Sequence, residues 1–425
     1  MINRVYGVIM PKLKLRWIIC FLVFSFLGYL GGTHRNYVYA SEAILSSDDA
    51  LKLATAFINM DRDTSEESFK SNIYVNSSEE IFNIDGEISG YLIQLEDIDK
   101  NPSGYVIVGA SHQQMPVIEY AYDGECFLET ARQYITNREG LAADDLMIYY
   151  LGGLDYYIGT ADDKYIYKVS SNGIVKIKRT EVNASEQIEF NDTGKEYINE
   201  LWKTWEDYVK ENVNNINISN ISKDNIIAAD KTSQPVYDSV SSVFILNYDK
   251  VPYTTIFDRN NDEDYQSGGV CATNLMLYWY CQDTKYSELF QTSWNNVFHN
   301  LYDDMSILQY CGAEPDEFLL AVKDYFKTNA SGYSSAAFYS FNADWDRVST
   351  EIDNNCPTAI VLQEGVSNEK QYVLGVGYKN YKVGTVDSPF VLIADGFGSK
   401  AVRYVHYSTD HKLGGGIAVI RLRPY

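Results

Sequence analysis

The sequence predicts an α+β protein, because its helical and strand-like segments are grouped instead of alternating one by one. Short runs of alternating apolar and polar residues fill residues 73–180, and a second group fills residues 357–423 after several helical segments. The chain has 425 residues, of which 45% are hydrophobic. This length and composition predict a large buried core and two or three domains.

The first forty residues have the features of an export signal. Basic Lys12, Lys14 and Arg16 precede the apolar run 17–30, and residues 38–40 form a small-residue cleavage site. The alternative is a membrane anchor, for which the apolar run is short. We therefore expect residues 1–40 to be a signal peptide and the remainder to be secreted into the extracellular space, with no membrane association after signal removal.

The charge balance argues against a nucleic-acid partner. The sequence has 35 Lys and Arg against 58 Asp and Glu, which gives a formal net charge of −23. Nucleic-acid binding needs clustered basic residues that neutralise phosphates. Removal of residues 1–40 would take away only basic charge, so the exported chain is more acidic still.

No cofactor and no metal site are expected. Of the six cysteines, Cys20 lies in the predicted signal, and the odd number that remains is unsuited to a disulfide-stapled scaffold. No Cys and His cluster has zinc-ligand spacing. The run 258–264 (DRNNDED) has oxygen ligands at alternate positions, but it lacks the glycine and the final glutamate of a calcium loop. Calcium binding stays an open alternative.

The first half is predicted to be a helix followed by an antiparallel meander and a second helix. Residues 48–60 have apolar side chains at helical spacing behind two serines. The runs 90–96, 104–110 and 115–124 are strand-like and are separated by turn pairs. The segment 196–213 is strongly amphipathic. The Asn-rich stretch 212–235 then predicts a linker, so we expect a prodomain-like α+β region over 41–211 and a second domain over 236–425.

The second half begins with helices and ends in strands. Residues 271–281 are apolar on all sides, which predicts a buried central helix. Residues 315–326 and 345–353 are amphipathic. The strand candidates are 357–363, 371–378, 390–395, 402–408 and 416–423. Helices followed by strands indicate an α+β domain.

Cys271 is the residue whose position best suits chemistry. The turn 267–269 (Ser-Gly-Gly) is expected to deliver it to the first turn of the buried helix, where unsatisfied N–H groups and the helix dipole stabilise a thiolate. A thiolate is a nucleophile for acyl transfer. The alternative is a structural cysteine, because an unpaired Cys packs as a small hydrophobic residue.

Several segments, in this order, resemble secreted bacterial papain-like cysteine peptidases of the streptopain type and their bacteriocin-peptidase-like relatives. The segments are GGVCATNLMLYWY (268–280), NLYDDM (300–305), NNCPTAIVL (354–362), QYVLGVGY (371–378), LIADGFG (392–398) and VRYVHYS (402–408). Residues 104–127 are similar to the inhibitory prodomain of that group. The resemblance covers most of 48–130 and 236–410. It implies a papain-like fold, a helical half plus an antiparallel β half, preceded by a β-rich prodomain that binds in cis.

The resemblance also assigns roles to three residues. It places Cys271 at the nucleophile position and Asp395 at the position that orients the base. The base position falls on Gln371, where such enzymes carry a histidine. A glutamine cannot accept a proton near neutral pH, although it can hydrogen-bond a thiol. Loss of the base costs on the order of 10²-fold to 10⁴-fold in rate.

The five histidines offer one substitute. His34 lies in the signal, His112 in the prodomain-like region and His299 in the helical half. His406 and His411 follow Asp395, which reverses the expected order, and His406 remains the alternative base. Gln266, upstream of the nucleophile position, is either an oxyanion-hole donor or a solvated loop residue.

These observations leave three hypotheses. The first is a peptidase homologue with an incomplete triad, weak or inactive in proteolysis, that binds a protein or peptide in its cleft. The second is an active thiol peptidase with His406 as a displaced base. The third is an extracellular interaction protein that retains the fold, in which Cys271 only packs.

Overall fold

A computed structural model of the chain describes residues 44–424 apart from several short gaps. The gaps are 65–66, 162–163, 183–191, 213–238, 257–265, 291, 306–311, 331–334, 341–342, 365–368, 384–385 and 408–415. The predicted signal peptide, the predicted linker 212–235 except its first residue, and the possible calcium loop 258–264 therefore lie outside the described residues. Among those that are described, no helix combines the length and the apolar character needed to cross a membrane.

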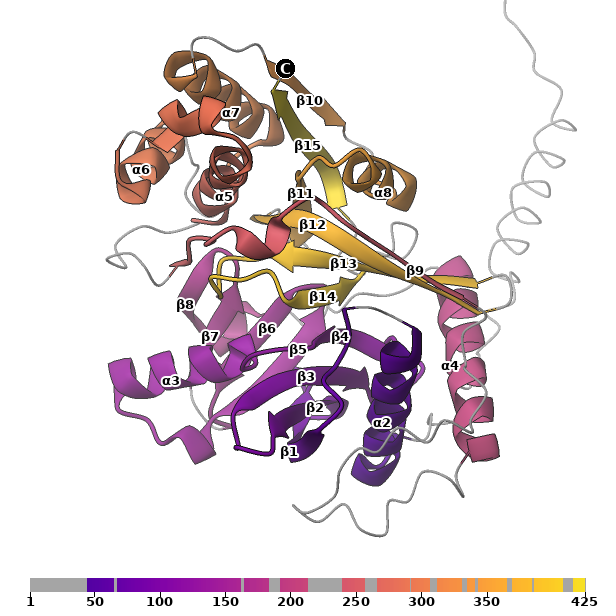
Figure 1. The fold of residues 1–425 in the computed structure, drawn as a ribbon. Helices are drawn as coiled ribbons and strands as arrows, with labels where there is room; N and C mark the ends of the chain where they lie inside the picture. The colour runs from indigo at the N-terminus through magenta and orange to yellow at the C-terminus, as the bar shows by residue number, and fades with distance from the viewer. Residues whose placement is uncertain are drawn as a thin grey trace, which may run out of the picture. The chain divides into compact units, whose positions relative to one another are not determined.

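The first half folds as a helix, a β meander, a second β group and a final helix (Figure 1). Its strands are β1 (Ile73–Phe82), β2 (Ile88–Asp97), β3 (Pro102–Gly109), β4 (Val117–Ala121), β5 (Met147–Gly152), β6 (Asp155–Gly159), β7 (Tyr165–Ser170) and β8 (Gly173–Lys178). Its α-helices are α2 (Ser47–Thr64), α3 (Phe127–Glu139) and α4 (Asp192–Asn212). The predicted meander is confirmed, because β1, β2, β3 and β4 pair antiparallel in sequence order.

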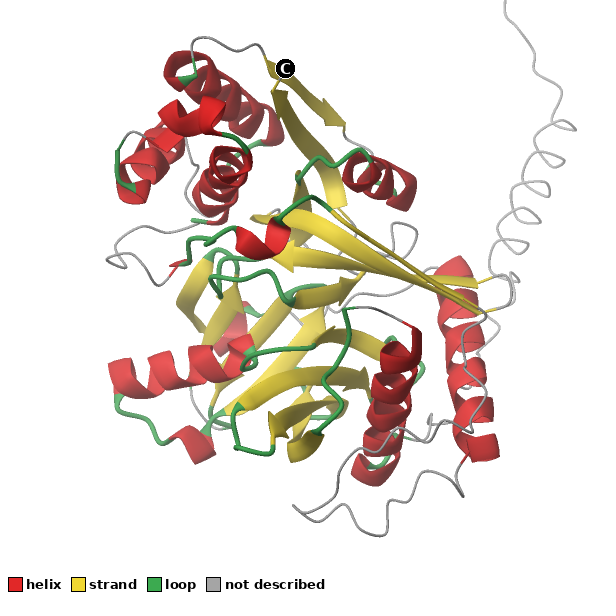
Figure 2. Ribbon diagram, viewed as in Figure 1, coloured by secondary structure: helices red, strands yellow, loops and turns green. Residues whose placement is uncertain are grey.

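The second half contributes further helices and strands, as the colouring by secondary structure shows (Figure 2). The helices are α5 (Ser267–Gln282), α6 (Trp294–Asp304), α7 (Pro315–Asn329) and α8 (Trp345–Asp353). The strands are β9 (Ser239–Phe244), β10 (Ser335–Ser340), β11 (Thr358–Glu364), β12 (Glu369–Val383), β13 (Val386–Ala394), β14 (Arg403–His406) and β15 (Gly416–Pro424). The predicted α+β class is confirmed.

All of these strands belong to one sheet that runs through both halves of the chain. Its order is β10-β15-β11-β12-β13-β14-β4-β3-β2-β1-β5-β6-β7-β8, and β9 pairs with β12. The two halves join where β4 pairs antiparallel with β14, with Tyr120 opposite Tyr404. Those two rings stack with centroids 4.7 Å apart. This pair is an example of aromatic packing across strands.

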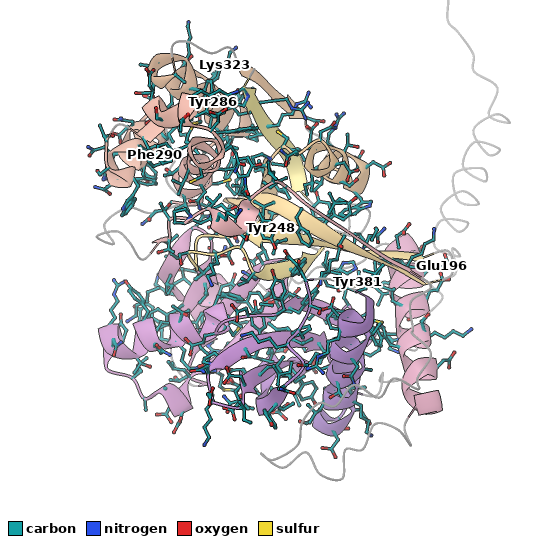
Figure 3. The ribbon with its side chains drawn as sticks, viewed as in Figure 1. Glu196, Tyr248, Tyr286, Phe290, Lys323 and Tyr381 are labelled. Atoms are coloured by element: carbon teal, nitrogen blue, oxygen red, sulfur yellow. The ribbon has the colours of Figure 1, made fainter. Side chains whose placement is uncertain are left out.

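Side chains add to this junction between the halves. Lys379 of β12 donates a hydrogen bond to Asp61 of α2 over 2.8 Å, and both side chains are completely buried. Tyr381, labelled in Figure 3, donates to the same carboxylate over 2.7 Å and contacts the Tyr120 hydroxyl at 2.8 Å. A buried charge pair with extra hydrogen bonds holds α2 against β12 in one geometry.

The buried helix predicted over 271–281 is confirmed, but it begins earlier than expected. Helix α5 starts at Ser267, so Cys271 is its fifth residue and lies beyond the first turn. Packing explains this difference. A Cβ on Gly269 would come within 2.1 Å of the Phe298 ring of α6, and a Cβ on Gly268 would meet Met305 at 3.3 Å. These close contacts favour a helical Gly-Gly pair despite its low helix propensity.

Candidate functional site

Cys271 is buried inside the protein core. Cys271 is 1% exposed, and its side chain is part of the main hydrophobic cluster. Burial raises the pKa of the thiol. At neutral pH the residue is therefore a protonated thiol, which is a poor nucleophile. These features are typical of a packing cysteine.

Ser267, which is also buried, is the residue that lies in the first turn of α5, where the sequence predicts Cys271. It is the first residue of the helix, and its Oγ accepts a hydrogen bond from the Tyr372 backbone N–H over 3.1 Å. Ser267 thus lies directly beside the strand that carries Gln371. The Ser-Gly-Gly run predicts a turn at this place. A serine immediately before an apolar helical run is also a helix-start signal, and that signal could have identified it.

Gln371 lies fully buried on β12 with a defined orientation. Its Oε1 accepts hydrogen bonds from Ser171, from the hydroxyl over 2.9 Å and from the backbone N–H over 3.3 Å. Its Nε2 has no hydrogen-bond partner within the part of the chain that the structure describes. The amide therefore keeps two N–H donors at the site.

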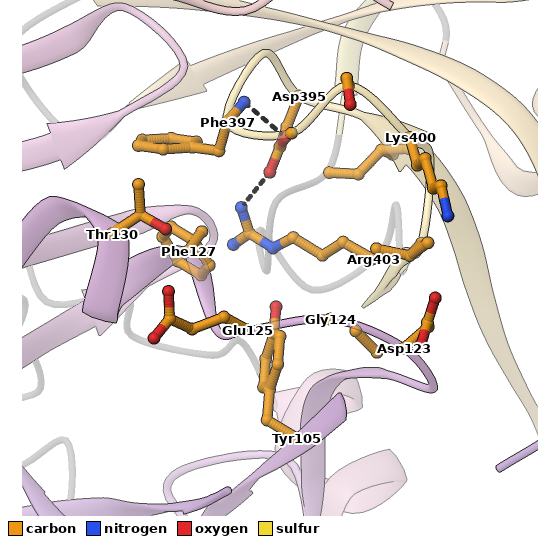
Figure 4. A pocket seen from close by; sticks show the side chains of 15 residues that line it. Tyr105, Asp123, Gly124, Glu125, Phe127, Thr130, Asp395, Phe397, Lys400 and Arg403 are labelled. Atoms are coloured by element: carbon orange, nitrogen blue, oxygen red, sulfur yellow. Dashed lines mark hydrogen bonds and ion pairs between the residues drawn. The ribbon is translucent and has the colours of Figure 1, made fainter. Parts of the chain in front are cut away.

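Asp395 follows β13 and binds an arginine. Its Oδ2 accepts from Arg403 Nη1 over 2.7 Å, and its Oδ1 accepts from the Phe397 N–H over 2.9 Å (Figure 4). The same arginine binds Glu119 of β4 at 2.6 Å, and its guanidinium lies 3.8 Å from the centre of the Phe127 ring. Burial opposes the charge on Arg403, but the carboxylates of Glu119 and Asp395 outweigh it and raise its pKa.

The pocket beside Asp395 belongs to the junction between the halves. It encloses about 290 Å³ and is lined by residues of β3, the β4–α3 segment and the loop after β13. Arg403 lines this pocket and binds Asp395 there, as Figure 4 shows. Both Asp395 oxygens are thus engaged with Arg403 and Phe397, and neither bonds to Gln371.

A tight turn from the first half packs against Ser267 and the start of β12. Hairpin β7–β8 reverses at Ser171 and Asn172, and Gly173 follows with φ of 119°, a conformation that favours glycine. Asn172 Oδ1 accepts from the Ser267 N–H over 3.2 Å and from the Ser267 hydroxyl. Asn172 Nδ2 donates to Glu369 Oε1 over 2.9 Å and to the Lys370 carbonyl over 3.1 Å.

An ion pair at the base of the hairpin fixes this turn. Lys168 of β7 donates to Glu369 Oε2 over 2.6 Å, so the same carboxylate binds both Lys168 and Asn172. Asn172, Ser171, Ser267 and Gln371 are all buried. Residues 170–173 therefore cover the candidate site in cis.

Comparison with known proteins does not assign the chain to a family. No protein-family model matches the sequence. A search of the curated proteins also finds no match.

His406 lies at a different place on the sheet. It is buried on β14 opposite Phe390, and its Nε2 lies 3.3 Å from the Tyr197 hydroxyl of α4. Asp395 is five residues further along the neighbouring strand than Phe390, which corresponds to roughly 17 Å at the usual rise of a strand. His112 contacts Asn199 and Glu206 on α4. His34 and His411 lie outside the described residues.

Gln266 is buried, so the interpretation of this residue as a solvated loop glutamine is wrong. It is the residue before α5, and its carbonyl accepts from the Val270 N–H over 2.9 Å. Its burial follows from the packing of the helix start against the rest of the core. Within the described ranges, no group of three or more His, Cys, Asp or Glu residues is arranged to hold a metal ion.

Chemically, the arrangement is rich in hydrogen-bond donors and acceptors. Ser267 offers a hydroxyl and a helix N-terminal N–H, Gln371 offers an amide, and Glu369 offers a carboxylate. None of these groups is an imidazole or an activated thiol. Such a set recognises peptide-like polar groups more readily than it transfers protons.

Proposed function

We propose that the chain is a secreted papain-like cysteine peptidase homologue that binds a protein or peptide segment in its cleft without hydrolysing it. The observation that carries this proposal is the pair formed by Ser267, at the start of α5, and Gln371, at the start of β12. Acyl transfer at this place needs a nucleophile activated by a base. A hydroxyl beside an amide supplies neither, because glutamine does not titrate near neutral pH.

The order of the elements supports the papain-like part of the proposal. A buried helix begins at the candidate site, and antiparallel strands carry the other two candidate residues, Gln371 and Asp395. The first half then acts as a prodomain-like region that binds in cis. Its β7–β8 turn lies against Ser267 and Gln371, which is where an extended ligand would contact the cleft.

The alternative of an active peptidase that uses His406 has less support. The contacts of His406 are with Tyr197 and Phe390, on the side of the sheet junction where α4 packs. The burial and raised pKa of Cys271 instead favour the idea that this cysteine only packs. A binding function needs no reactive thiol.

The proposal is tested by a hydrolysis assay on residues 41–425 with a fluorescently labelled unstructured protein. The wild type is compared with a variant that carries Ser171→Ala and Asn172→Ala, so that occupation of the cleft in cis is weakened. We expect the wild type and this variant to hydrolyse the labelled protein no faster than buffer alone. A matched pair, Ser267→Cys with Gln371→His against Ser267→Cys alone, tests whether the missing groups account for the inactivity. Wild-type cleavage that Ser267→Ala or Cys271→Ala abolishes would overturn the proposal.

A further inference from the structure

The contacts of Asn172 form a complete set for one chemical group. A primary carboxamide has an oxygen that accepts two hydrogen bonds and a nitrogen that donates two. The oxygen of Asn172 accepts from the N–H and the hydroxyl of Ser267. Its nitrogen donates to Glu369 Oε1 over 2.9 Å and to the Lys370 carbonyl over 3.1 Å. All four positions are satisfied by the second half of the chain.

The groups around the Asn172 carboxamide distinguish its nitrogen from its oxygen. Two acceptors, a carboxylate and a carbonyl, face the nitrogen, and two donors face the oxygen. A carboxylate in place of the amide would have no N–H for Glu369 and would repel it. An apolar side chain of the same shape would remove the hydrogen bonds that Asn172 makes to Ser267, Glu369 Oε1 and the Lys370 carbonyl. Buried polar groups that lose their partners are costly, so the site discriminates against both.

A second observation concerns Gln371, whose amide nitrogen lies near the site of Asn172. Gln371 is completely buried, and its Nε2 has no hydrogen-bond partner among the residues that the structure describes. Its Oε1 is turned toward Ser171, next to the carboxamide. An unpaired buried donor beside a filled carboxamide site fits the backbone carbonyl of a longer segment.

We propose that Ser267, Glu369 and Lys370 form a receptor for a primary carboxamide, and that the external ligand of the cleft is a peptide with an asparagine side chain in a tight turn. Asn172 stands in for that side chain in cis. This inference deepens the proposed function and rests on it, because it names the ligand class of the same cleft. The hairpin shape of the cis segment specifies a turn instead of an extended strand.

The receptor is tested with acetamide on residues 41–425 carrying Asn172→Gly. This substitution removes the atoms that acetamide supplies. We expect acetamide to raise the thermal unfolding midpoint of the variant saturably, by about 1–3 °C at about ten times its dissociation constant. Acetate should have no such effect. Asn101→Gly, which removes an exposed carboxamide from another turn, is the matched control. If Asn172→Gly does not fold, Asn172→Ala with formamide replaces it.

The ligand class is tested by fluorescence anisotropy with the same variant. The probes are a labelled peptide of residues 166–177 and its two analogues, with aspartate or leucine in place of the asparagine. We expect the asparagine peptide to bind and each analogue to bind at least about tenfold more weakly. Equal binding of the three peptides, binding of none, or an equal effect of acetamide and acetate would overturn the inference. Equal binding of the three peptides would contradict the carboxamide specificity but not the proposed peptide-binding function. Hydrolysis of the labelled protein by the wild type would contradict the proposed function, but it would not change the interpretation of the acetamide experiment.

Discussion

At the scale of single residues, Ser267 and Cys271 lie about one helical turn apart on α5, and their surroundings differ. Ser267 is at the end of α5 with its hydroxyl at the cleft, and Cys271 is inside the core. The dipole and the unpaired N–H groups of a helix act mainly within its first turn. They favour an anion near Ser267, while burial raises the pKa of Cys271.

Thiol labelling should separate the cysteines of the folded protein. Cys281 is exposed, whereas Cys126, Cys271 and Cys356 are buried. We expect a disulfide reagent at pH 8 to modify Cys281 quickly and Cys271 only after unfolding, because burial keeps the Cys271 thiol protonated and inaccessible. Peptide mapping by mass spectrometry after timed labelling measures this. Rapid labelling of Cys271 in the folded protein would contradict the assignment, and a Cys281→Ser variant controls for the exposed thiol.

The sequence identified part of the site for a physical reason. Gln371 was singled out by the resemblance, which puts the base position at the start of this strand, and only its lack of a titratable proton follows from its side chain alone. The role of Asn172 could not be found, because it depends on a contact with Glu369 that is almost two hundred positions away in the chain. The start of α5 was misplaced for a similar reason. Two glycines predict a turn locally, whereas the close approach of the Phe298 ring to Gly269 depends on how α6 packs against α5.

At the scale of elements, α5 and α6 pack so closely that no side chain fits at one position. A Cβ on Gly269 would come within 2.1 Å of the Phe298 ring, whereas Gly268 has 3.3 Å to the flexible Met305 side chain. We expect Gly269→Ala to destabilise the protein by about 1–3 kcal/mol through overpacking, in spite of the better helix propensity of alanine. Urea unfolding measures the effect. Gly268→Ala is the matched control, and an equal loss of stability in both variants would contradict the packing argument.

The contact between α2 and β12 depends on a buried ion pair. Removal of Asp61 by Asp61→Ala would leave Lys379 buried without its partner, so we expect a loss of about 3–5 kcal/mol. The combination of Asp61→Leu with Lys379→Met should recover much of this loss. Chemical unfolding of the three variants and the wild type is the measurement. A double variant as unstable as the single one would show that the charge itself is not the cause.

The same lysine gives a predicted pH dependence. Burial lowers the pKa of Lys379 from its ordinary value of 10.5, and Asp61 only partly offsets this. Between the lowered pKa and 10.5 the unfolded chain binds more protons than the folded one, so this group increases the stability as the pH rises through that window. Unfolding at pH 7 to 10 in the wild type and in Lys379→Met measures the difference. A smaller rise in the wild type than in the variant would contradict the prediction.

At the scale of the whole molecule, the two halves share one sheet. The meander, the central helix and the class were predictable, because apolar periodicity is a local property of the sequence. The pairing of β4 with β14 was not, since the sequence gives no register between strands so far apart. Buried ion pairs cross the same junction, from Arg403 to Glu119 and from Lys379 to Asp61. The first half, held in this way, is an integral part of the fold.

Cutting the chain between the halves should therefore not separate them. We expect that a protease site inserted within residues 216–235 can be cleaved and that both fragments then elute together in size-exclusion chromatography. They should separate only in denaturant, because the β4–β14 ladder and the buried ion pairs persist. Arg403→Ala in the same cleavable chain serves as a weakened control. Dissociation of the unmodified fragments in native buffer would contradict the prediction.

The hairpin that carries Asn172 lies at the free end of the sheet order, while the first half is paired to the second through β4. On our proposal the turn is a ligand tethered in cis, for which even a short flexible tether gives an effective concentration of about millimolar order. An outside peptide competes against that concentration and not against an empty site. If the proposal holds, the site responds to a threshold: only an abundant or tightly binding segment displaces residues 170–173, and weak encounters leave the protein unchanged.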